Sequence, residues 1–183
     1  MVRVISGIAK GRRLKVPEGL RVRPTSDKVK ESLFNILAPD LAGSVFLDLF
    51  AGCGGVGIEA LSRGASESIF IDQDPHLIRI LRENIQKCGF QEKARVIRGE
   101  ILTRLRQNAI PSCDIAFADP PYRLHRPEEL LILLANNVTI KKFLIYEHMS
   151  KMMPASSVGR FILRRTYAYG DTALSFFEEG KLD

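Results

Sequence analysis

The stretch from Val45 to Ile58, VFLDLFAGCGGVGI, constrains the fold more than any other part of the chain. It opens with a short apolar run, continues through a cluster of glycines and ends where apolar residues begin to recur at helical spacing. That order predicts a buried strand, a tight turn and a helix. Glycines allow positive φ and close approach of a ligand, and the helix that follows presents unpaired N–H groups and a positive dipole end. We therefore expect a nucleoside-containing cofactor here.

The glycine spacing alone leaves two cofactor classes open. Gly52, Gly54 and Gly57 satisfy the dinucleotide fingerprint G-x-G-x-x-G, and Asp72 lies 20 positions after the first of them. Asp48, however, places an acid inside the apolar strand, which a pyrophosphate site would not favour. The segment Asp-x-Phe-Ala-Gly-x-Gly that begins there resembles motif I of the class I methyltransferases that use S-adenosylmethionine. That cofactor carries an ammonium and a sulfonium, whose positive charge suits Asp48.

The composition predicts a single-domain cytoplasmic protein. With 183 residues, 45% of them hydrophobic, the chain is long enough for one proper core. No apolar run reaches the ~18 residues of a membrane span, and the N-terminus lacks the apolar segment of a signal peptide. Three cysteines without C-x-x-C spacing are typical of free thiols, and three scattered histidines predict no metal site. We expect a monomer that does not bind membranes.

Positive charge is concentrated at the N-terminus. Residues 1–30 hold nine lysines and arginines against two acids, so their net charge of +7 exceeds the +6 of the whole chain. Such a segment is the electrostatic footprint of a nucleic acid partner, although a merely solvated basic surface is the alternative. Residues 2–16 alternate loosely around a glycine, which predicts a β-hairpin whose Lys10, Arg12 and Arg13 project towards RNA. The expected RNA contacts in this segment are Lys10, Arg12, Arg13, Lys15, Arg21 and Arg23.

A helix is expected from about Asp27, capped by Thr25 or Ser26 and ended by Pro39. The stretch Leu20–Leu37 resembles the start of the RsmD family of ribosomal RNA guanine methyltransferases, whose pattern runs much like L-R-P-T-x-D-x-V-R-E-x-L-F-N-x-L. One residue is inserted before the Arg-Pro pair, and lysine replaces arginine at position 30. The resemblance implies that this region, with Thr25, supplies one wall of the cofactor site.

Acids at the ends of the next two expected strands complete that site. In class I methyltransferases an acid at the position of Asp72 accepts hydrogen bonds from the ribose hydroxyls. Asp74 competes for this role, but Asp74-Pro75 is more typical of an N-cap followed by proline at the first helical position. Glu100 stands where the methyltransferase pattern usually has Asp for the adenine amino group, and Ile101 would pack on the adenine. The implied cofactor residues are Thr25, Asp48, Phe50, Ala51, Gly52, Gly54, Asp72, Gln73, Glu100 and Ile101.

The second specific signal is Asp119-Pro120-Pro121-Tyr122, which directly follows an apolar strand. It resembles motif IV of methyltransferases that act on exocyclic amines of bases. The prolines make the backbone rigid, so the Asp119 carboxylate and the Pro120 carbonyl can accept the two hydrogens of one amine. Tyr122 can stack on the base, and Arg123 and Arg126 suit the phosphates beside a flipped nucleotide. Asp119, Pro120 and Tyr122 are the predicted catalytic residues. Asp119 either takes the amine proton or only orients the amine.

Strands alternate with helices and end in an expected hairpin of residues 161–168 and 172–177. This order predicts an α/β class I S-adenosylmethionine-dependent methyltransferase (Rossmann-like) fold. We expect seven strands, parallel in the order 3-2-1-4-5 and then antiparallel in a 7-6 pair. One domain would span residues 1–183, with a hairpin extension over 1–22 and the catalytic fold over 23–183. The resemblance to the RsmD family implies methyl transfer to N2 of one guanine in 16S ribosomal RNA, either free or within the small ribosomal subunit.

Three other functions remain open on these residues. An adenine-N6 or other exocyclic-amine methyltransferase shares the last motif, but those acting on DNA usually carry a further target-recognition domain. A nicotinamide dehydrogenase fits the glycines, but no catalytic His/Lys constellation is visible. An RNA-binding module with a vestigial cofactor fold would need damaged motifs, and these are intact.

Overall fold

The computed structural model describes residues 2–17, 26–121 and 127–180. They group into two compact units, Met1–Gly99 and Glu100–Asp183, which are described one after the other. Six of the residues predicted to form the site lie outside the described residues, and their roles stay predictions: Arg21, Arg23, Thr25, Tyr122, Arg123 and Arg126. The division into one domain with a short extension also stays a prediction.

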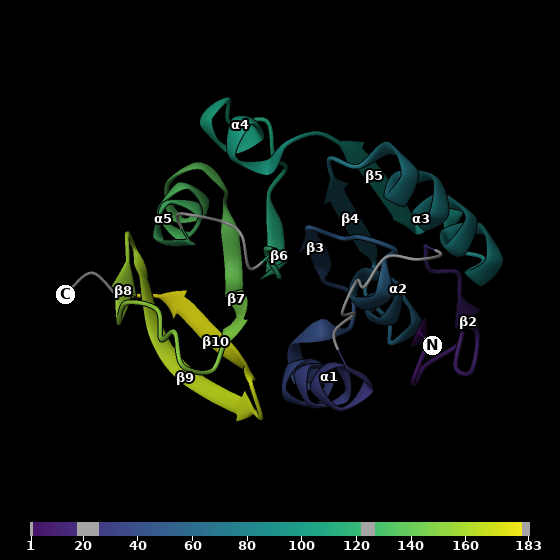
Figure 1. Cartoon of the computed structure of the whole chain (residues 1–183), viewed down its shortest axis with the longest axis horizontal. Coiled ribbons are helices and arrows are strands. Elements are labelled where there is room, and N and C mark those ends of the chain that lie inside the picture. The colour runs from purple at the N-terminus through teal and green to yellow at the C-terminus, as the bar shows by residue number, and fades with distance from the viewer. Residues whose placement is uncertain (1, 18–25, 122–126, 181–183) are drawn as a thin grey trace. The chain divides into compact units, whose positions relative to one another are not determined.

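The N-terminal unit combines a two-stranded antiparallel sheet with three parallel strands (Figure 1). The predicted hairpin is confirmed, since β1 (Val2–Arg3) pairs with β2 (Arg13–Leu14). The parallel strands lie in the order β5 (Ala94–Arg98), β4 (Glu67–Asp72) and β3 (Val45–Leu49). In order of appearance along the chain this is the expected 3-2-1.

Three α-helices and a short 3-10 helix connect these strands: α1 (Asp27–Leu41), α2 (Gly55–Ser62), α3 (Pro75–Cys88) and η1 (Gln91–Lys93). The start of α1 is as predicted, because the Ser26 hydroxyl accepts the N–H of Val29. The prediction that Pro39 ends this helix is wrong, since α1 continues to Leu41. A proline removes the hydrogen bond to the carbonyl four residues earlier. That residue, Asn35, is exposed, so solvent can replace the missing hydrogen bond to its carbonyl and the last turn is tolerated.

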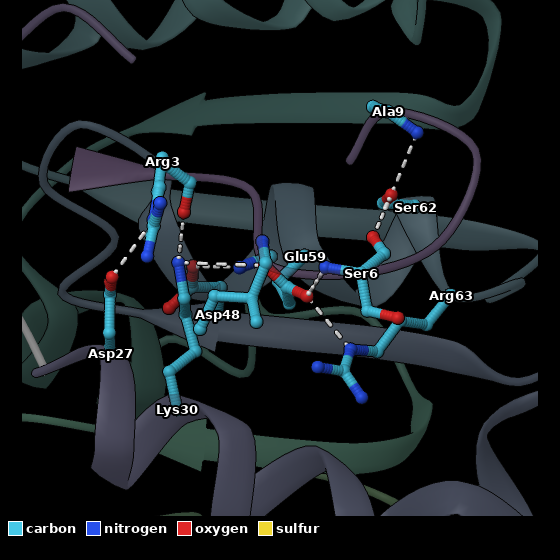
Figure 2. A network of polar contacts seen from close by, with 11 residues as sticks. Arg3, Ser6, Ala9, Asp27, Lys30, Asp48, Glu59, Ser62 and Arg63 are labelled. Atoms are coloured by element: carbon cyan, nitrogen blue, oxygen red, sulfur yellow. Dashed lines mark hydrogen bonds and ion pairs between the residues drawn. The ribbon is translucent and has the colours of Figure 1, made fainter. Parts of the chain in front are cut away.

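The backbone of the N-terminal hairpin is held against α2 and α3. The Glu59 carboxylate of α2 accepts the backbone N–H groups of Ile5 at 2.7 Å and Ser6 at 2.9 Å (Figure 2). Asn84 of α3 exchanges two hydrogen bonds with the backbone of Lys15, of 2.7 and 2.9 Å. The basic side chains of the hairpin therefore lie exposed on the surface of a packed unit: Lys10, Arg12, Arg13 and Lys15.

The described residues of the C-terminal unit form two helices and five strands: α4 (Ile101–Arg106), β6 (Cys113–Ala118), α5 (Pro127–Asn137), β7 (Ile140–Met149), β8 (Ser157–Val158), β9 (Phe161–Tyr169) and β10 (Thr172–Glu179). The strands lie in the order β6-β7-β10-β9-β8 (Figure 1). The first two are parallel, and β10 is antiparallel to both of its neighbours. This matches the expected order 4-5-7-6, and β8 adds a short edge strand in a segment for which no strand was predicted.

Each unit buries its own apolar core. Phe34, Phe46 and Phe70 are buried in the first unit, and Phe117, Phe161 and Phe177 in the second. The mostly parallel sheet, its antiparallel last hairpin and the N-terminal two-stranded sheet confirm the predicted α/β fold class. Among the helices of the described residues, none combines the length and the apolar character that crossing a bilayer requires.

Candidate active site

The chain reverses sharply between β3 and α2. Phe50 has φ of +63°, which is uncommon for a residue other than glycine. Gly54 has φ of +87°, and a Cβ there would lie 2.4 Å from the Leu81 side chain, so both conformation and packing require glycine. At Gly52 a Cβ would meet no atom closer than 4.0 Å. The backbone at Gly52 is therefore open to a ligand, as the turn was predicted to be.

Asp48 is a buried acid beneath this turn. Its Oδ2 atom accepts the N–H of Gly57, in the first turn of α2, at 2.8 Å. Burial raises the pKa of Asp48 to about 7, and the negative charge of Asp72 adds to the rise. Both causes act against the ionised form, so a bound cation would relieve the cost of keeping Asp48 charged. This is the electrostatic setting that an ammonium or sulfonium group needs.

Asp72 lies at the carboxyl end of β4 and joins two turns. Its Oδ2 atom accepts the N–H of Gly52 at 2.8 Å, and its Oδ1 atom accepts the N–H of Asp74 at 2.9 Å. Each carboxylate oxygen can accept a second hydrogen bond, so capacity for hydroxyl donors remains. Asp74 instead caps α3 by accepting the N–H groups of His76 and Leu77, as predicted. Contact between Asp72 and the ribose hydroxyls stays a prediction.

The residues near these two acids in the sequence lie in the same turns. Ala51 is buried, and its N–H donates to the carbonyl of Ile71 at 3.0 Å, which binds the glycine turn to β4. Gln73 is exposed beside Asp72. The predicted cofactor residues of the N-terminal unit that are described therefore gather at the carboxyl ends of β3 and β4.

Glu100 and Ile101 open the C-terminal unit. Glu100 caps α4 by accepting the N–H groups of Leu102 at 3.1 Å and Thr103 at 2.6 Å. Partial burial opposes ionisation, but the hydrogen bonds from Thr103 and Leu102 prevail and lower the pKa of Glu100. The sequence alone did not reveal this capping role. Contact between Glu100 and adenine stays a prediction, as does packing of the buried Ile101 on the ring.

Asp119 and Pro120 follow β6 directly, and the structure places Tyr146 beside them. Ala118 pairs with Tyr146 in the parallel ladder between β6 and β7. Burial raises the pKa of Tyr146 to about 12, and the negative charge of Asp119 contributes to the rise. Tyr146, Pro120 and Pro121 line one cavity. Tyr146 was assigned only to a strand from the sequence. The available signal was its place at the carboxyl end of a strand, where ligands of such sheets bind.

The basic side chains predicted to bind RNA differ in their contacts. Lys15 pairs with Glu83 at 2.7 Å, and Arg12 donates to the carbonyl of Lys87. Lys10 and Arg13 are exposed. In the part of the chain that the structure describes, no three His, Cys, Asp or Glu side chains gather as a metal ion would require.

Comparison with known proteins places the chain in a family. The family model described as conserved hypothetical protein 95 matches residues 2–178. The chain is 37% identical over 182 residues to YlbH of Bacillus subtilis, covering 97% of this chain and 99% of that protein. It is 41% identical over 157 residues to the ribosomal RNA small subunit methyltransferase D of Haemophilus influenzae, covering 84% of this chain and 81% of that protein.

A solved structure agrees with these relatives. The structure of yhhF from Escherichia coli aligns with a TM-score of 0.86 and 31% identity, covering 98% of this chain and 99% of that chain. The family model, the identities and the fold lead to one conclusion. The chain belongs to the conserved hypothetical protein 95 family, the RsmD family of ribosomal RNA methyltransferases.

Proposed function

We propose that this chain transfers a methyl group from S-adenosylmethionine to the N2 amine of one guanine in 16S ribosomal RNA. The main support is the buried Asp48, which lies at the glycine turn and would be stabilised in its charged form by a cation. The same chain has Asp119-Pro120 directly after β6. Family membership supports ribosomal RNA as the substrate, since the Haemophilus influenzae relative is named for the small-subunit RNA.

The residues of the N-terminal unit fit this cofactor. When bound, S-adenosylmethionine supplies an electrophilic methyl group on a sulfonium. Asp48 would carry the counter-charge, because its pKa near 7 lets a cation draw it into the ionised form. Asp72 would accept the ribose hydroxyls with the capacity that Gly52 and Asp74 leave. The other proposed contacts are Thr25, Phe50, Ala51, Gly54, Gln73, Glu100 and Ile101.

The acceptor chemistry rests on Asp119 and Pro120. The lone pair of a guanine N2 amine is delocalised into the ring, so the amine is a poor nucleophile. The Asp119 carboxylate and the Pro120 carbonyl would accept its two hydrogens and direct the lone pair at the methyl carbon. Most of the rate gain then comes from positioning and electrostatics. After transfer, the ionised Asp119 accepts the surplus proton of the nitrogen or stabilises it until water removes it.

RNA would be held by positive charge. The exposed side chains of the hairpin, Lys10, Arg12, Arg13 and Lys15, would contact phosphates. Arg21, Arg23, Arg123 and Arg126 complete the proposed set, and Tyr122 would stack on the base. Such contacts fix the register of the RNA but do not select the nucleotide.

The proposal is tested by nucleoside mass spectrometry after incubation with labelled cofactor and unmodified 16S ribosomal RNA or small subunits. Label is expected in N2-methylguanine. Asp119→Ala should abolish transfer while calorimetry shows unchanged cofactor affinity. Asp119→Asn should be milder, because the amide oxygen still accepts one hydrogen bond. Label in N6-methyladenine, or label only in DNA, would contradict the proposal.

The cofactor half has its own test. Asp72→Ala should weaken S-adenosylmethionine binding by roughly 1.5–3 kcal/mol, because two hydroxyls lose a charged acceptor. Asp74→Ala is the matched control, since Asp74 caps α3 and should affect folding more than affinity. Unchanged affinity in a folded Asp72→Ala variant would move the ribose contact elsewhere.

A further inference from the structure

The C-terminal unit contains a cavity of about 120 Å³ that the cofactor contacts proposed above do not use. Residues from three segments line it: Pro120, Pro121, Glu128, Leu131, Tyr146–Met149 and Met152–Pro154. This set is called the methionine pocket below. Its volume is well below the ~300 Å³ at which pockets for drug-sized ligands begin. The size suits a single planar ring system better than a whole nucleotide.

Two aromatic side chains form a rigid wall of this pocket. The rings of Tyr146 and His148 stack, with centroids 5.3 Å apart and planes inclined by 20°. His148 Nδ1 lies 2.8 Å from the carbonyl oxygen of Met149, and its Nε2 lies 2.8 Å from Ser175 Oγ. Burial lowers the pKa of His148, which favours the neutral ring. Because a carbonyl only accepts, Nδ1 carries the proton and Nε2 accepts from the Ser175 hydroxyl.

That assignment fixes the direction of a hydrogen-bond chain behind the wall. The Ser175 hydroxyl gives its proton to His148, so it must accept from Thr166, whose Oγ1 lies 2.8 Å away. Ser175 is fully buried and lies on β10, opposite Tyr146 in the strand register. The imidazole is therefore held at both nitrogens, and the phenol ring stacked on it has a fixed plane.

The rim of the pocket is apolar and exposed. Met149, Met152 and Met153 are 38%, 52% and 58% exposed, and they are three of the four methionines in the chain. Packing inside the protein does not explain exposed methionines. Their flexible, polarizable thioethers make favourable contacts with aromatic rings and adapt to different shapes. Such a rim over a flat wall suits a planar aromatic ligand.

The polar groups of the pocket select among such ligands. Glu128 and Glu147 both line it, as does Pro120 of the acceptor motif. Carboxylates accept hydrogen bonds from the N–H groups of a base and repel phosphate. The pocket therefore suits the base of a nucleotide and not its phosphate.

We propose that the methionine pocket binds the base that accepts the methyl group, a purine whose ring lies along the wall of Tyr146 and His148. The identity of that base as guanine rests on the proposed function. Tyr146 then contacts the substrate, and His148, Ser175 and Thr166 are positioning residues that fix its ring.

Binding can be measured without methyl transfer. Protein labelled with methyl-¹³C methionine would be titrated with guanosine 5′-monophosphate, with saturating S-adenosylhomocysteine to block the cofactor site. The methyl signals of Met149, Met152 and Met153 should move upfield by ring-current shifts. Ribose 5-phosphate should leave them unmoved. Tyr146→Ala should weaken the apparent affinity about tenfold, as expected for loss of one stacking contact, and Tyr146→Phe should restore it. Tyr167→Ala is the matched control on β9.

The outcomes separate this inference from the proposed function. If the nucleotide leaves the methionine signals unchanged, or moves them no more than ribose 5-phosphate does, the pocket inference is overturned even when ribosomal RNA is methylated. If the nucleotide shifts them but the wild-type protein methylates no RNA, the pocket stands and the proposed function fails.

The positioning chain has a separate readout. Ser175→Ala removes the donor to His148 and should raise the KM for RNA several-fold while cofactor affinity stays constant. Ser175→Thr, which restores a hydroxyl, should recover most of the loss. If Ser175→Ala changes only the thermal unfolding midpoint and leaves KM unchanged, the hydrogen bonds among Thr166, Ser175 and His148 are merely structural.

Discussion

Each of the two units is held together by a different kind of polar contact. The N-terminal unit uses buried charges, which meet where the N-terminal segment, α1 and α2 converge (Figure 2). Lys30 Nζ lies 3.5 Å from the Glu59 carboxylate and donates to the carbonyl of Arg3 at 2.6 Å. Glu59 also accepts from Arg63 at 2.8 Å. Burial lowers the pKa of Lys30, which the negative charge of Glu59 partly offsets.

The methionine pocket of the C-terminal unit is held by neutral groups instead. A stacked phenol and imidazole are fixed by two hydroxyls and one backbone carbonyl. The difference follows the proposed ligands. A cationic cofactor needs a negative site, and the buried Asp48 that would supply it is held by the N–H of Gly57. A neutral base needs a flat, fixed surface, and the neutral hydrogen bonds behind the stacked rings supply it.

The largest expected effect comes from breaking the charged network. Glu59→Ala should lower the free energy of unfolding by about 3–5 kcal/mol, because it leaves Lys30 buried without its carboxylate. Urea denaturation measures this. Glu83→Gln is the control: it removes an exposed ion pair with Lys15 and should cause no measurable change in the free energy of unfolding. A similarly small effect of Glu59→Ala would mean that the buried charges are not what holds this unit together.

Asp48 should make the stability of the N-terminal unit fall as pH rises. Its pKa rises from 3.8 to about 7 on folding, so the folded state binds the proton more tightly. The stabilisation is complete below pH ~4 and is lost by pH ~7, at up to about 1.4 kcal/mol for each pH unit. Asp48→Asn should remove this dependence, raise the unfolding midpoint at pH 8 and weaken cofactor binding. Hydrogen exchange of β3 at several pH values measures this dependence. Protection of the wild-type protein that does not change with pH would contradict the prediction.

His148 should give the C-terminal unit the opposite dependence. Burial lowers its pKa from 6.5, so the folded state holds the neutral ring. The stabilisation is present above pH ~6.5 and is lost as pH falls towards the lowered pKa. His148→Gln should flatten this profile. Ser175→Ala should cost about 1–3 kcal/mol, because it leaves a buried nitrogen without its donor. Exchange protection of β10 that stayed constant on acidification would contradict the assignment.

The smallest effect on stability is expected at the hairpin surface. Lys10→Ala and Arg13→Ala should leave the unfolding midpoint unchanged, since both residues are exposed. For each phosphate contact that is lost, the slope of log K for RNA binding against log salt concentration should become shallower by about 0.7–0.9. Lys93→Ala removes an equally exposed charge outside the hairpin and is the matched control. A slope equal to that of the parent would show that the hairpin does not contact RNA.

Short-range features of this protein could be predicted from its sequence alone. A helix cap at Thr25 or Ser26, the Asp74-Pro75 helix start and the glycine turn after β3 were predicted, and the structure has all three, with Ser26 as the cap. Each depends on residues within a few positions of one another, where hydrogen bonding and φ are set locally. The resemblance to class I methyltransferases supplied the strand order, which local patterns do not contain.

Contacts between residues that are far apart in the sequence were decided by the tertiary structure. The hairpin itself was predicted, but not that Glu59 and Asn84, some 50 to 70 residues away, bind its backbone. Tyr146 reaches the acceptor motif because β7 pairs with β6 in a register that places it opposite Ala118. Ser175 meets His148 only because β10 lies against β7. Hydrophobic periodicity shows which face of a strand is buried. It does not show which residue of another strand lies opposite, because that register depends on the packing of the whole sheet.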